Sequence, residues 1–410
     1  MTAASGGAGP RTPAPGGTGP GTAASGGAGP ETAAFRDHSV VAAADRSRWQ
    51  TRRRARRWAL ALRSGRGTAV VCALGVVACA LSVALVITVG QAGIGVADVW
   101  RVVAARLGGA DAGLTPLREG IVWELRLPRA LLAAVCGAGL GLCGAVLQSL
   151  LRNPLADPFV LGVSSGASTG AVSVVVLGVG GGALSLSAGA FAGAALSFAL
   201  VLLLAHTSGG TTDRVLLSGI AAMQLFSALT SLIVFVSADA EQTRGVLFWL
   251  LGSLGSASWA EVAVGAGALA LTLVVCLARA HALDAFAFGP EAAAALGVRV
   301  RRMRLTLLLV TALLTAVLVS SAGAIGFVGL VLPHAARAAC GPAHRRLLPV
   351  TALLGAVFLV WVDTAARTLL APRELPVGVA TSLLGVPAFV LILHRGRRGR
   401  GAPGRAGAGL

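Results

Sequence analysis

Residues 125–170 read LRLPRALLAAVCGAGLGLCGAVLQSLLRNPLADPFVLGVSSGASTG, and this stretch decides the class of fold. From Ala130 to Leu151 it is uncharged and rich in Leu, Ala, Val and Gly. At about 1.5 Å per residue, a helix of this length crosses roughly 30 Å of hydrocarbon. Gly137, Gly141 and Ala145 recur every fourth residue, so one helix face lets another backbone approach closely. The stretch therefore predicts a transmembrane helix that packs tightly against a neighbour.

The composition of the whole chain is that of an integral membrane protein. Hydrophobic residues make up 55% of its 410 residues, charged residues 12%, and the mean hydropathy is +0.81. A soluble core of this length could not hide so much apolar surface. The formal net charge is +18, but the arginines cluster between apolar segments without aromatic stacking platforms, so we expect no nucleic-acid partner.

The basic residues also bear on nucleotide chemistry. All 34 of them are arginine, and a phosphate-binding Walker A loop requires a lysine. The chain is therefore expected not to be an enzyme, with no catalytic residue and no ATP hydrolysis of its own. Any nucleotide energy would come from a partner subunit.

Three segments are expected along the chain. Residues 1–66 join a Gly/Pro/Ala-rich tail, which carries TAASGGAGP twice, to nine arginines over 46–66. The tail has too little apolar surface to repay the entropy of ordering, so we expect it to be disordered. Residues 67–396 hold the membrane spans, and 397–410 form a second basic tail. Because basic segments stay on the inner side of a membrane, both termini are expected in the cytoplasm.

Ten apolar segments predict ten spans of a multi-pass cell-membrane protein in contact with the lipid bilayer: 69–90, 130–151, 160–178, 183–205, 215–237, 258–278, 305–322, 326–340, 347–370 and 377–394. With both termini inside, 26 of the 34 arginines fall on inner segments, as the positive-inside rule requires. Segment 326–340 is short for a crossing, which predicts a broken or protein-buried helix. On the outer side, an amphipathic helix is expected from Val96 to Leu107, and a re-entrant helix within 239–256.

Motifs spread over roughly residues 70–395 resemble one family. They are RLPR at 126–129, RNPLADPFVLGVSSGAS at 152–168, FWLLGS at 248–253, GFVGLVLPH at 326–334 and ELPVG at 374–378. In these motifs the chain is similar to the FecCD-type permease subunits of ABC importers for iron-siderophores, haem and cobalamin. The resemblance implies an all-α membrane fold of about ten helices in two inverted five-helix halves, the type II ABC importer permease.

The resemblance also implies partners and cargo. It predicts a second permease subunit, as a homo- or heterodimer, two ATP-binding subunits that carry ATP and Mg, and an extracellular substrate-binding lipoprotein. No cofactor and no metal site is assigned to this chain, because the cargo would be a preformed chelate. An iron(III)-siderophore complex is the expected cargo, with haem or cobalamin as the alternative.

The connection 279–304 is the largest between spans, and we expect a short helix in its middle with Pro290 near its start and a C-cap glycine. In the family this loop docks into a groove on the ATPase and transmits force. The family usually has two acidic residues after the first glycine, whereas here Pro290 precedes a single glutamate. A solvated basic connector is the simpler interpretation. The resemblance assigns the coupling role to Gly289, Glu291, Ala293, Ala294, Leu296 and Gly297.

Three arginines are expected near the outer surface. Arg126 and Arg129 lie three residues apart and would share a helix face, and Arg367 lies near the outer end of another span. The resemblance assigns them to docking on acidic residues of the binding protein, where charge pairing sets orientation and association rate. Anchoring in the lipid headgroups is the alternative.

Two groups of polar residues remain. Thr211, Thr212 and Asp213 at the inner mouth of a span are candidates for an inner gate, or for capping the helix that they begin. Four more polar groups are expected at membrane depth, where they are costly, and for each we favour hydrogen bonding between helices over contact with substrate: Gln148, Gln224, His334 and Asp363.

Two other classes of function stay open. An ion-coupled secondary transporter would need intramembrane acidic residues beside broken helices, and Asp363 is the one carboxylate well within a predicted span. A structural membrane scaffold would show no coupling to ATP. Neighbouring genes for an ATPase and a lipoprotein would separate these alternatives from an ABC importer.

Overall fold

The computed structural model describes residues 65–90, 94–109, 113–182, 185–207, 211–237 and 239–400. Every regular element in these ranges is a helix. The predicted disorder of residues 1–66 and the predicted tail 397–410 lie almost entirely outside the described residues.

The helices follow one another in the order given at the end of this sentence: α2 (Gly65–Thr88), α3 (Val96–Gly108), α4 (Pro116–Gly120), η1 (Ile121–Arg126), α5 (Leu127–Leu150), η2 (Pro158–Leu161), α6 (Val163–Leu177), α7 (Leu186–Thr207), α8 (Thr212–Ser237), α9 (Ala240–Leu250), α10 (Trp259–Ala278), α11 (Ala280–Phe286), α12 (Pro290–Ala295), α13 (Val300–Ala322), α14 (Val328–Cys340), α15 (His344–Thr368) and α16 (Val377–Arg400). Within the described ranges, seven helices are long and apolar enough to span a membrane, and α6, α14 and the apolar part of α16 are shorter. Together they correspond to the ten predicted segments.

One predicted boundary is wrong. The second span does not begin at Ala130, because α4, η1 and α5 run on as one helix of 35 residues from Pro116. Its charged first turns are tolerated because they lie at the end of the molecule. There Glu119 forms an ion pair with Arg106 of α3, with 2.8 Å between Glu119 Oε1 and Arg106 Nε. The predicted amphipathic helix from Val96 to Leu107 is confirmed as α3.

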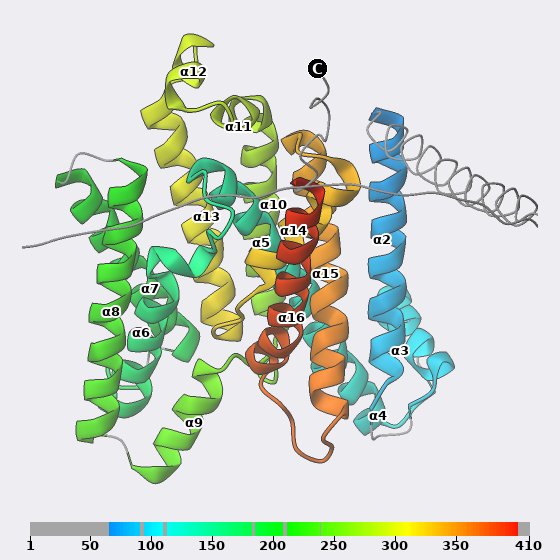
Figure 1. Cartoon of the computed structure of the whole chain (residues 1–410). Helices are drawn as coiled ribbons and strands as arrows, with labels where there is room; N and C mark the ends of the chain where they lie inside the picture. The colour runs from blue at the N-terminus through cyan, green and yellow to red at the C-terminus, as the bar shows by residue number, and fades with distance from the viewer. Residues whose placement is uncertain are drawn as a thin grey trace, which may run out of the picture. The chain divides into compact units, whose positions relative to one another are not determined.

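Helix α5 occupies the centre of the fold, with α2 and α8 toward opposite sides (Figure 1). Its predicted small-residue face is confirmed as a packing face. A Cβ atom on Gly137 would lie 2.1 Å from the carbonyl oxygen of Gly355 in α15, and one on Gly141 would lie 3.2 Å from that of Thr351 in the same helix. No side chain fits at 2.1 Å, so Gly137 lets the backbones touch.

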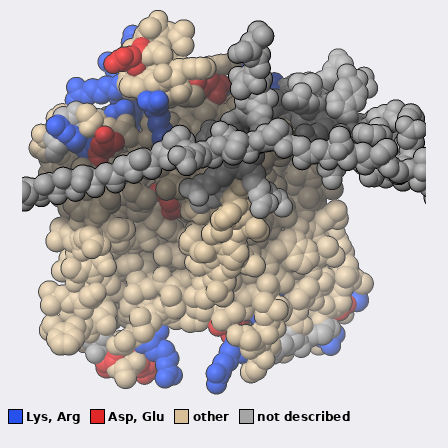
Figure 2. Space-filling model, in the orientation of Figure 1, with Lys and Arg blue, Asp and Glu red and all other residues tan. Residues whose placement is uncertain are grey.

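On the face that Figure 2 shows, charged side chains gather at two opposite ends of the described molecule, and few lie between them. One end carries α11 and α12, and the other carries α3, α4 and α9 (Figure 1). We call these the α12 end and the α3 end. An uncharged belt between two charged ends is the surface of a multi-pass membrane protein.

The predicted interrupted segment 239–256 folds as α9 followed by a non-helical strip. The backbone N–H of Ser253 donates to the carbonyl of Ala322 at 2.9 Å, that of Val377 donates to Gly252 at 2.9 Å, and that of Gly378 donates to Leu251 at 3.1 Å. The strip therefore joins the end of α13 to the start of α16 through main-chain hydrogen bonds.

Candidate functional site

The predicted helix of the 279–304 connection is confirmed as α12. Gly289 has φ +108° and lets the chain turn after α11, and Pro290 opens the new helix. Gly297 has φ +83°, and its backbone N–H donates to the carbonyl of Ala294 at 2.9 Å, which ends the helix.

The residues predicted to couple do not all face outward. Ala293 is fully buried, whereas Glu291 and Ala294 are exposed and 70% of Leu296 is exposed. Phe288, which the sequence did not single out, is 79% exposed beside them. Its position, as a large apolar residue just before a Gly-Pro helix start in a basic loop, is the signal that could have identified it.

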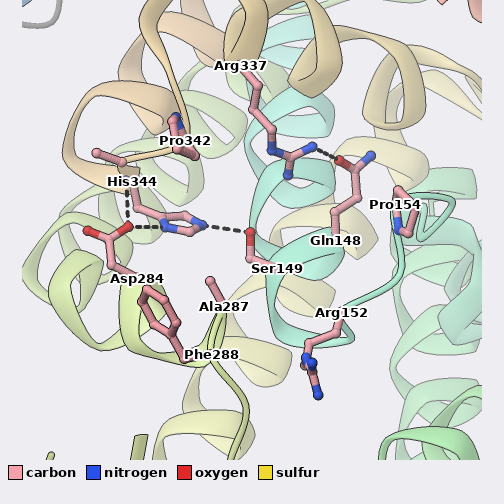
Figure 3. Close-up of a pocket in the computed structure, with 11 residues that line it drawn as sticks. Gln148, Ser149, Arg152, Pro154, Asp284, Ala287, Phe288, Arg337, Pro342 and His344 are labelled. Carbon is pink, nitrogen blue, oxygen red and sulfur yellow. Dashed lines mark hydrogen bonds and ion pairs between the residues drawn. The ribbon is translucent and has the colours of Figure 1, made fainter. Parts of the chain in front are cut away.

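Below α11 and α12, a cleft of about 610 Å³ opens between the ends of α5, α14 and α15. His344, the first residue of α15, stands between Asp284 of α11 and Ser149 of α5 (Figure 3). Its Nδ1 lies 2.6 Å from Asp284 Oδ1, and its Nε2 lies 2.7 Å from Ser149 Oγ. The imidazole thus bridges three helices that are far apart in sequence.

Asp284 also caps α15. Its Oδ1 accepts the backbone N–H of His344 at 3.0 Å. The first N–H groups of a helix have no partner within it, and a carboxylate suits the positive end of the helix dipole. Helix α15 therefore receives its N-terminal cap from α11, because Ala343 has no side chain that could cap it.

On the other side of the cleft, Gln148 links α5 to α14. Its Nε2 donates to the carbonyls of Gly329 at 3.2 Å and Leu330 at 3.1 Å, and its Oε1 accepts from Arg337 Nη1 at 2.6 Å (Figure 3). The predicted bonding between helices is confirmed for this glutamine. His334 instead bonds within its own helix, through Nδ1 and the carbonyl of Leu330 at 2.9 Å. Gln224 is exposed on α8.

At the α3 end, the structure brings the three predicted arginines together around adjoining cavities of about 260 and 490 Å³. Arg129 is mostly buried there and already paired. Its Nη2 lies 2.9 Å from Asp363 Oδ1, and its Nη1 lies 3.1 Å from Glu374 Oε2. The predicted bonding of Asp363 between helices is thereby confirmed, and the charge of Arg129 is matched within the chain.

Arg126 and Arg367 have a different environment. Arg126 Nη1 donates to the carbonyl of Ile87 at 2.8 Å, and Arg367 Nη2 donates to that of Val86 at 2.7 Å. Both carbonyls lie in the last turn of α2, where acceptors lack partners within the helix and the dipole favours a cation. Among the described residues, neither arginine forms an ion pair, and the three arginines at the cavity walls outnumber the two carboxylates there, Asp363 and Glu374, so the walls carry a net positive charge.

The candidate gate lies at the start of α8. The carbonyl of Thr211 accepts the N–H of Val215 at 3.1 Å, as at the beginning of a helix. Thr212 Oγ1 accepts from Arg304 Nη2 of α13 at 3.2 Å, and Asp213 is exposed in the first turn. The residues thus begin a helix and contact α13, and their role as a gate stays a prediction.

Asp157 lies outside the spans, in the RNPLADPF motif, and the sequence did not single it out. Its Oδ1 accepts the backbone N–H of Phe159 at 3.0 Å and begins η2. Burial raises the pKa of this carboxyl to about 6, and the hydrogen bond from Phe159 opposes the rise. Glycine at 329 leaves room for its other oxygen, which would lie 3.3 Å from a Cβ at that position.

Comparison with known proteins gives one consistent family. The sequence model of the FecCD transport family matches residues 77–395. The cobalamin import system permease protein BtuC of Halobacterium salinarum is 44% identical over 289 residues, which cover 69% of this chain and 75% of that protein. The hemin transport system permease protein HmuU of Yersinia pestis is 39% identical over 311 residues, covering 72% and 93% respectively.

A solved structure gives the same fold. It is described as an inward-facing conformation of a metal-chelate type ABC transporter, and it superposes with a TM-score of 0.68 at 28% sequence identity. The superposition covers 79% of this chain and 98% of that one.

Proposed function

The chain belongs to the FecCD transport family and is a multi-pass permease subunit of an ABC importer; on that premise we propose that it carries iron(III)-siderophore complexes across the cell membrane. A preformed metal chelate is consistent with the likeness to a metal-chelate type transporter. The observation that supports ATP-driven import is the exposed surface of α12, because a permease of this kind is expected to present a short helix to its ATPase.

We propose that two ATP-binding subunits, which hold ATP and Mg, dock at the α12 end. Glu291, Ala294 and Ala295 are exposed on α12, and Leu296 at its C-cap and Phe288 before its start extend this surface. Small and apolar side chains suit a groove in a partner. Gly289 and Gly297 fix the two ends of the helix, and buried Ala293 holds it against the loop rather than touching the partner.

The α12 end is then the cytoplasmic end, with both termini on that side. The arginine distribution supports this orientation, since 26 of the 34 arginines fall on the segments assigned to the inside. The α3 end faces outward, where Arg126 and Arg367 offer unpaired positive charge to acidic residues of a substrate-binding lipoprotein. Arg129 does not offer free charge, because it is paired with Asp363 and Glu374, and its role is to stabilise that surface.

A second permease subunit would complete the pathway, in the type II arrangement of paired inverted halves. Thr211, Thr212 and Asp213 are the proposed inner gate of that pathway, with Thr212 held by Arg304. The ion-coupled alternative loses support, because Asp363 is bound to Arg129 rather than left beside a broken helix.

Cobalamin is the second candidate cargo, favoured by the 44% identity to the cobalamin permease, and haem is the third. Uptake into proteoliposomes that contain the permease, its ATPase and its binding protein would decide among them. We expect ATP-dependent uptake of a ferric siderophore that an ATPase-dead partner abolishes. Uptake of cyanocobalamin or haemin alone would replace the siderophore assignment, and transport without the ATPase would refute the importer itself.

A further inference from the structure

Helices α5 and α15 are joined at three levels along their length. At the α12 end, Ser149 Oγ lies 2.7 Å from His344 Nε2. In the middle, the backbones touch at Gly137 and Gly355, where a Cβ on either would lie 2.1 Å from the other's carbonyl oxygen. At the α3 end, Arg129 of the helix that begins at α4 is paired with Asp363 at 2.9 Å. The two helices therefore have little freedom to slide past each other.

Each end of this pair is also held by an acidic residue from a connecting segment. Asp284 of α11 contacts His344 through both the imidazole Nδ1 and the backbone N–H. Glu374, in the segment before α16, contacts Arg129 at 3.1 Å. One segment belongs to the proposed ATPase-docking loop, and the other borders the arginine cavities of the α3 end.

We propose that α5 and α15 move as one rigid unit that couples the two ends of the permease, and that His344 is the positioning residue through which α11 grips this unit. The proposal rests on the proposed function, since it assumes that an ATPase acts on α11 and α12 and that a binding protein acts on the α3 end. It adds the physical route between those two sites and assigns Asp284, His344 and Ser149 to it.

The chemistry of the bridge suits a permanent grip. The carboxylate of Asp284 can only accept hydrogen bonds, so His344 Nδ1 carries a hydrogen and donates a hydrogen bond to it. With neutral imidazole, Ser149 donates to Nε2; with imidazolium, Nε2 donates to Ser149, whose hydroxyl can then donate to the carbonyl of Ala145 at 3.1 Å. Both bridging bonds survive in either state. Water has little access to the imidazole, because His344 is 4% exposed, whereas 37% of the Asp284 side chain is exposed to the cleft.

An acid, an imidazole and a hydroxyl in this order also occur in nucleophilic triads. Ser149, however, lies inside a helical turn with its Oγ 3.1 Å from the carbonyl of Ala145 in the preceding turn, and it donates its one hydrogen to that carbonyl when Nε2 carries its own hydrogen. The hydroxyl is tied to the backbone of α5, which suits it to hold that helix rather than to attack a substrate.

The decisive experiment uses the reconstituted complex of permease, ATPase and binding protein, and it measures ATP hydrolysis with and without loaded binding protein. In His344→Ala and Asp284→Ala, the stimulation by loaded binding protein, measured as the ratio of stimulated to basal hydrolysis of the same complex, should fall by about fivefold or more. Asp284→Asn keeps an oxygen that can accept both N–H groups, so it should retain most of the stimulation. His281→Ala, an exposed histidine on the same short helix, is the matched control and should behave as the wild type.

A second measurement tests the grip without any partner. Hydrogen exchange of the isolated permease should rise in the first turn of α15 in Asp284→Ala, because the N–H of His344 loses its acceptor, and should stay low in His281→Ala. Should His344→Ala fail to assemble, Ser149→Ala and Asp284→Ala each remove one arm and carry the test instead.

The two measurements distinguish a failure of the proposed function from a failure of the coupling route. A wild-type complex without stimulated hydrolysis would refute the proposed function, while the exchange measurement would still decide whether α11 grips α15. Stimulation at the wild-type level in both His344→Ala and Asp284→Ala would overturn the coupling route and leave the importer assignment intact.

Discussion

Arg129 and Asp363 form an ion pair at 2.9 Å in which the carboxylate side chain is 4% exposed. Truncation of Arg129 to Ala would leave Asp363 buried without its partner. We expect a loss of about 3–5 kcal/mol in the free energy of unfolding, measured by thermal or denaturant unfolding in detergent. Arg101→Ala is the control, because that arginine is paired with Asp98 on the exposed surface of α3 and should cost about 1 kcal/mol or less. Equal losses in the two variants would argue against a structural role for the buried pair.

We expect Arg126 and Arg367 to supply the positive charge that attracts the substrate-binding protein. Replacing both by Gln should weaken binding of the loaded binding protein by about tenfold or more and flatten its dependence on salt, because long-range attraction depends on uncompensated charge. Surface plasmon resonance at several ionic strengths measures both effects. Arg118→Gln changes an exposed arginine at the same end and should alter neither. An unchanged salt dependence in the double variant would show that docking uses another surface.

A bulky side chain on the exposed face of α12 should disrupt the complex with the ATPase. Ala294→Arg is expected to fold and reach the membrane normally, yet to lose co-purification with the ATPase, since a large charge would meet a closely fitted groove. Ala293→Arg should instead reduce expression or stability, because Ala293 is fully buried within the loop. Ala240→Arg, at the exposed start of α9, is the control. If Ala294→Arg transports and co-purifies like the wild type, α12 does not contact the ATPase.

Gly137 should be irreplaceable for a reason unrelated to helix propensity. A Cβ at this position would lie 2.1 Å from the carbonyl of Gly355, so Gly137→Ala must separate α5 from α15 and should lower the unfolding temperature markedly. Gly267 of α10 has no neighbouring atom within 4 Å of its would-be Cβ. Gly267→Ala should therefore change stability by only about 1 kcal/mol or less. Similar effects at both sites would contradict the tight backbone contact.

Asp157 should make stability depend on pH. Its pKa is raised to about 6 from 3.8, so the folded chain binds its proton more tightly than the unfolded chain does. The contribution to stability is fully present below about pH 4 and is lost as pH rises to about 6. Asp157→Asn keeps an acceptor for Phe159, so it should be more stable than the wild type at pH 7, by at most about 3 kcal/mol, with no advantage at pH 4. Unfolding of both proteins across this range measures the difference; a constant offset would rule out titration of this carboxyl.

Sequence periodicity and motifs predicted the ten apolar helices and the packing face of α5, because those features repeat over many residues. Helix starts were harder, as at Pro116, since charged turns at a molecular end look like a loop. The orientation of Ala293 could not be predicted, because a helix of six residues is too short to show a buried face. The bridge from Asp284 to Ser149 joins helices that only the tertiary fold brings together, and no local pattern marks it.

The strip after α9 predicts a specific pattern of sequence conservation in the family. Gly252, Gly323 and Gly378 each face a foreign carbonyl oxygen at 2.3–2.5 Å from a would-be Cβ, and the bonds between their segments are all main chain. An alignment of the family should therefore show three nearly invariant columns with no covariation among them, because a glycine has no side chain to exchange with a partner. Contact inference from correlated substitutions would miss this junction, although it fixes where α13 ends and α16 begins.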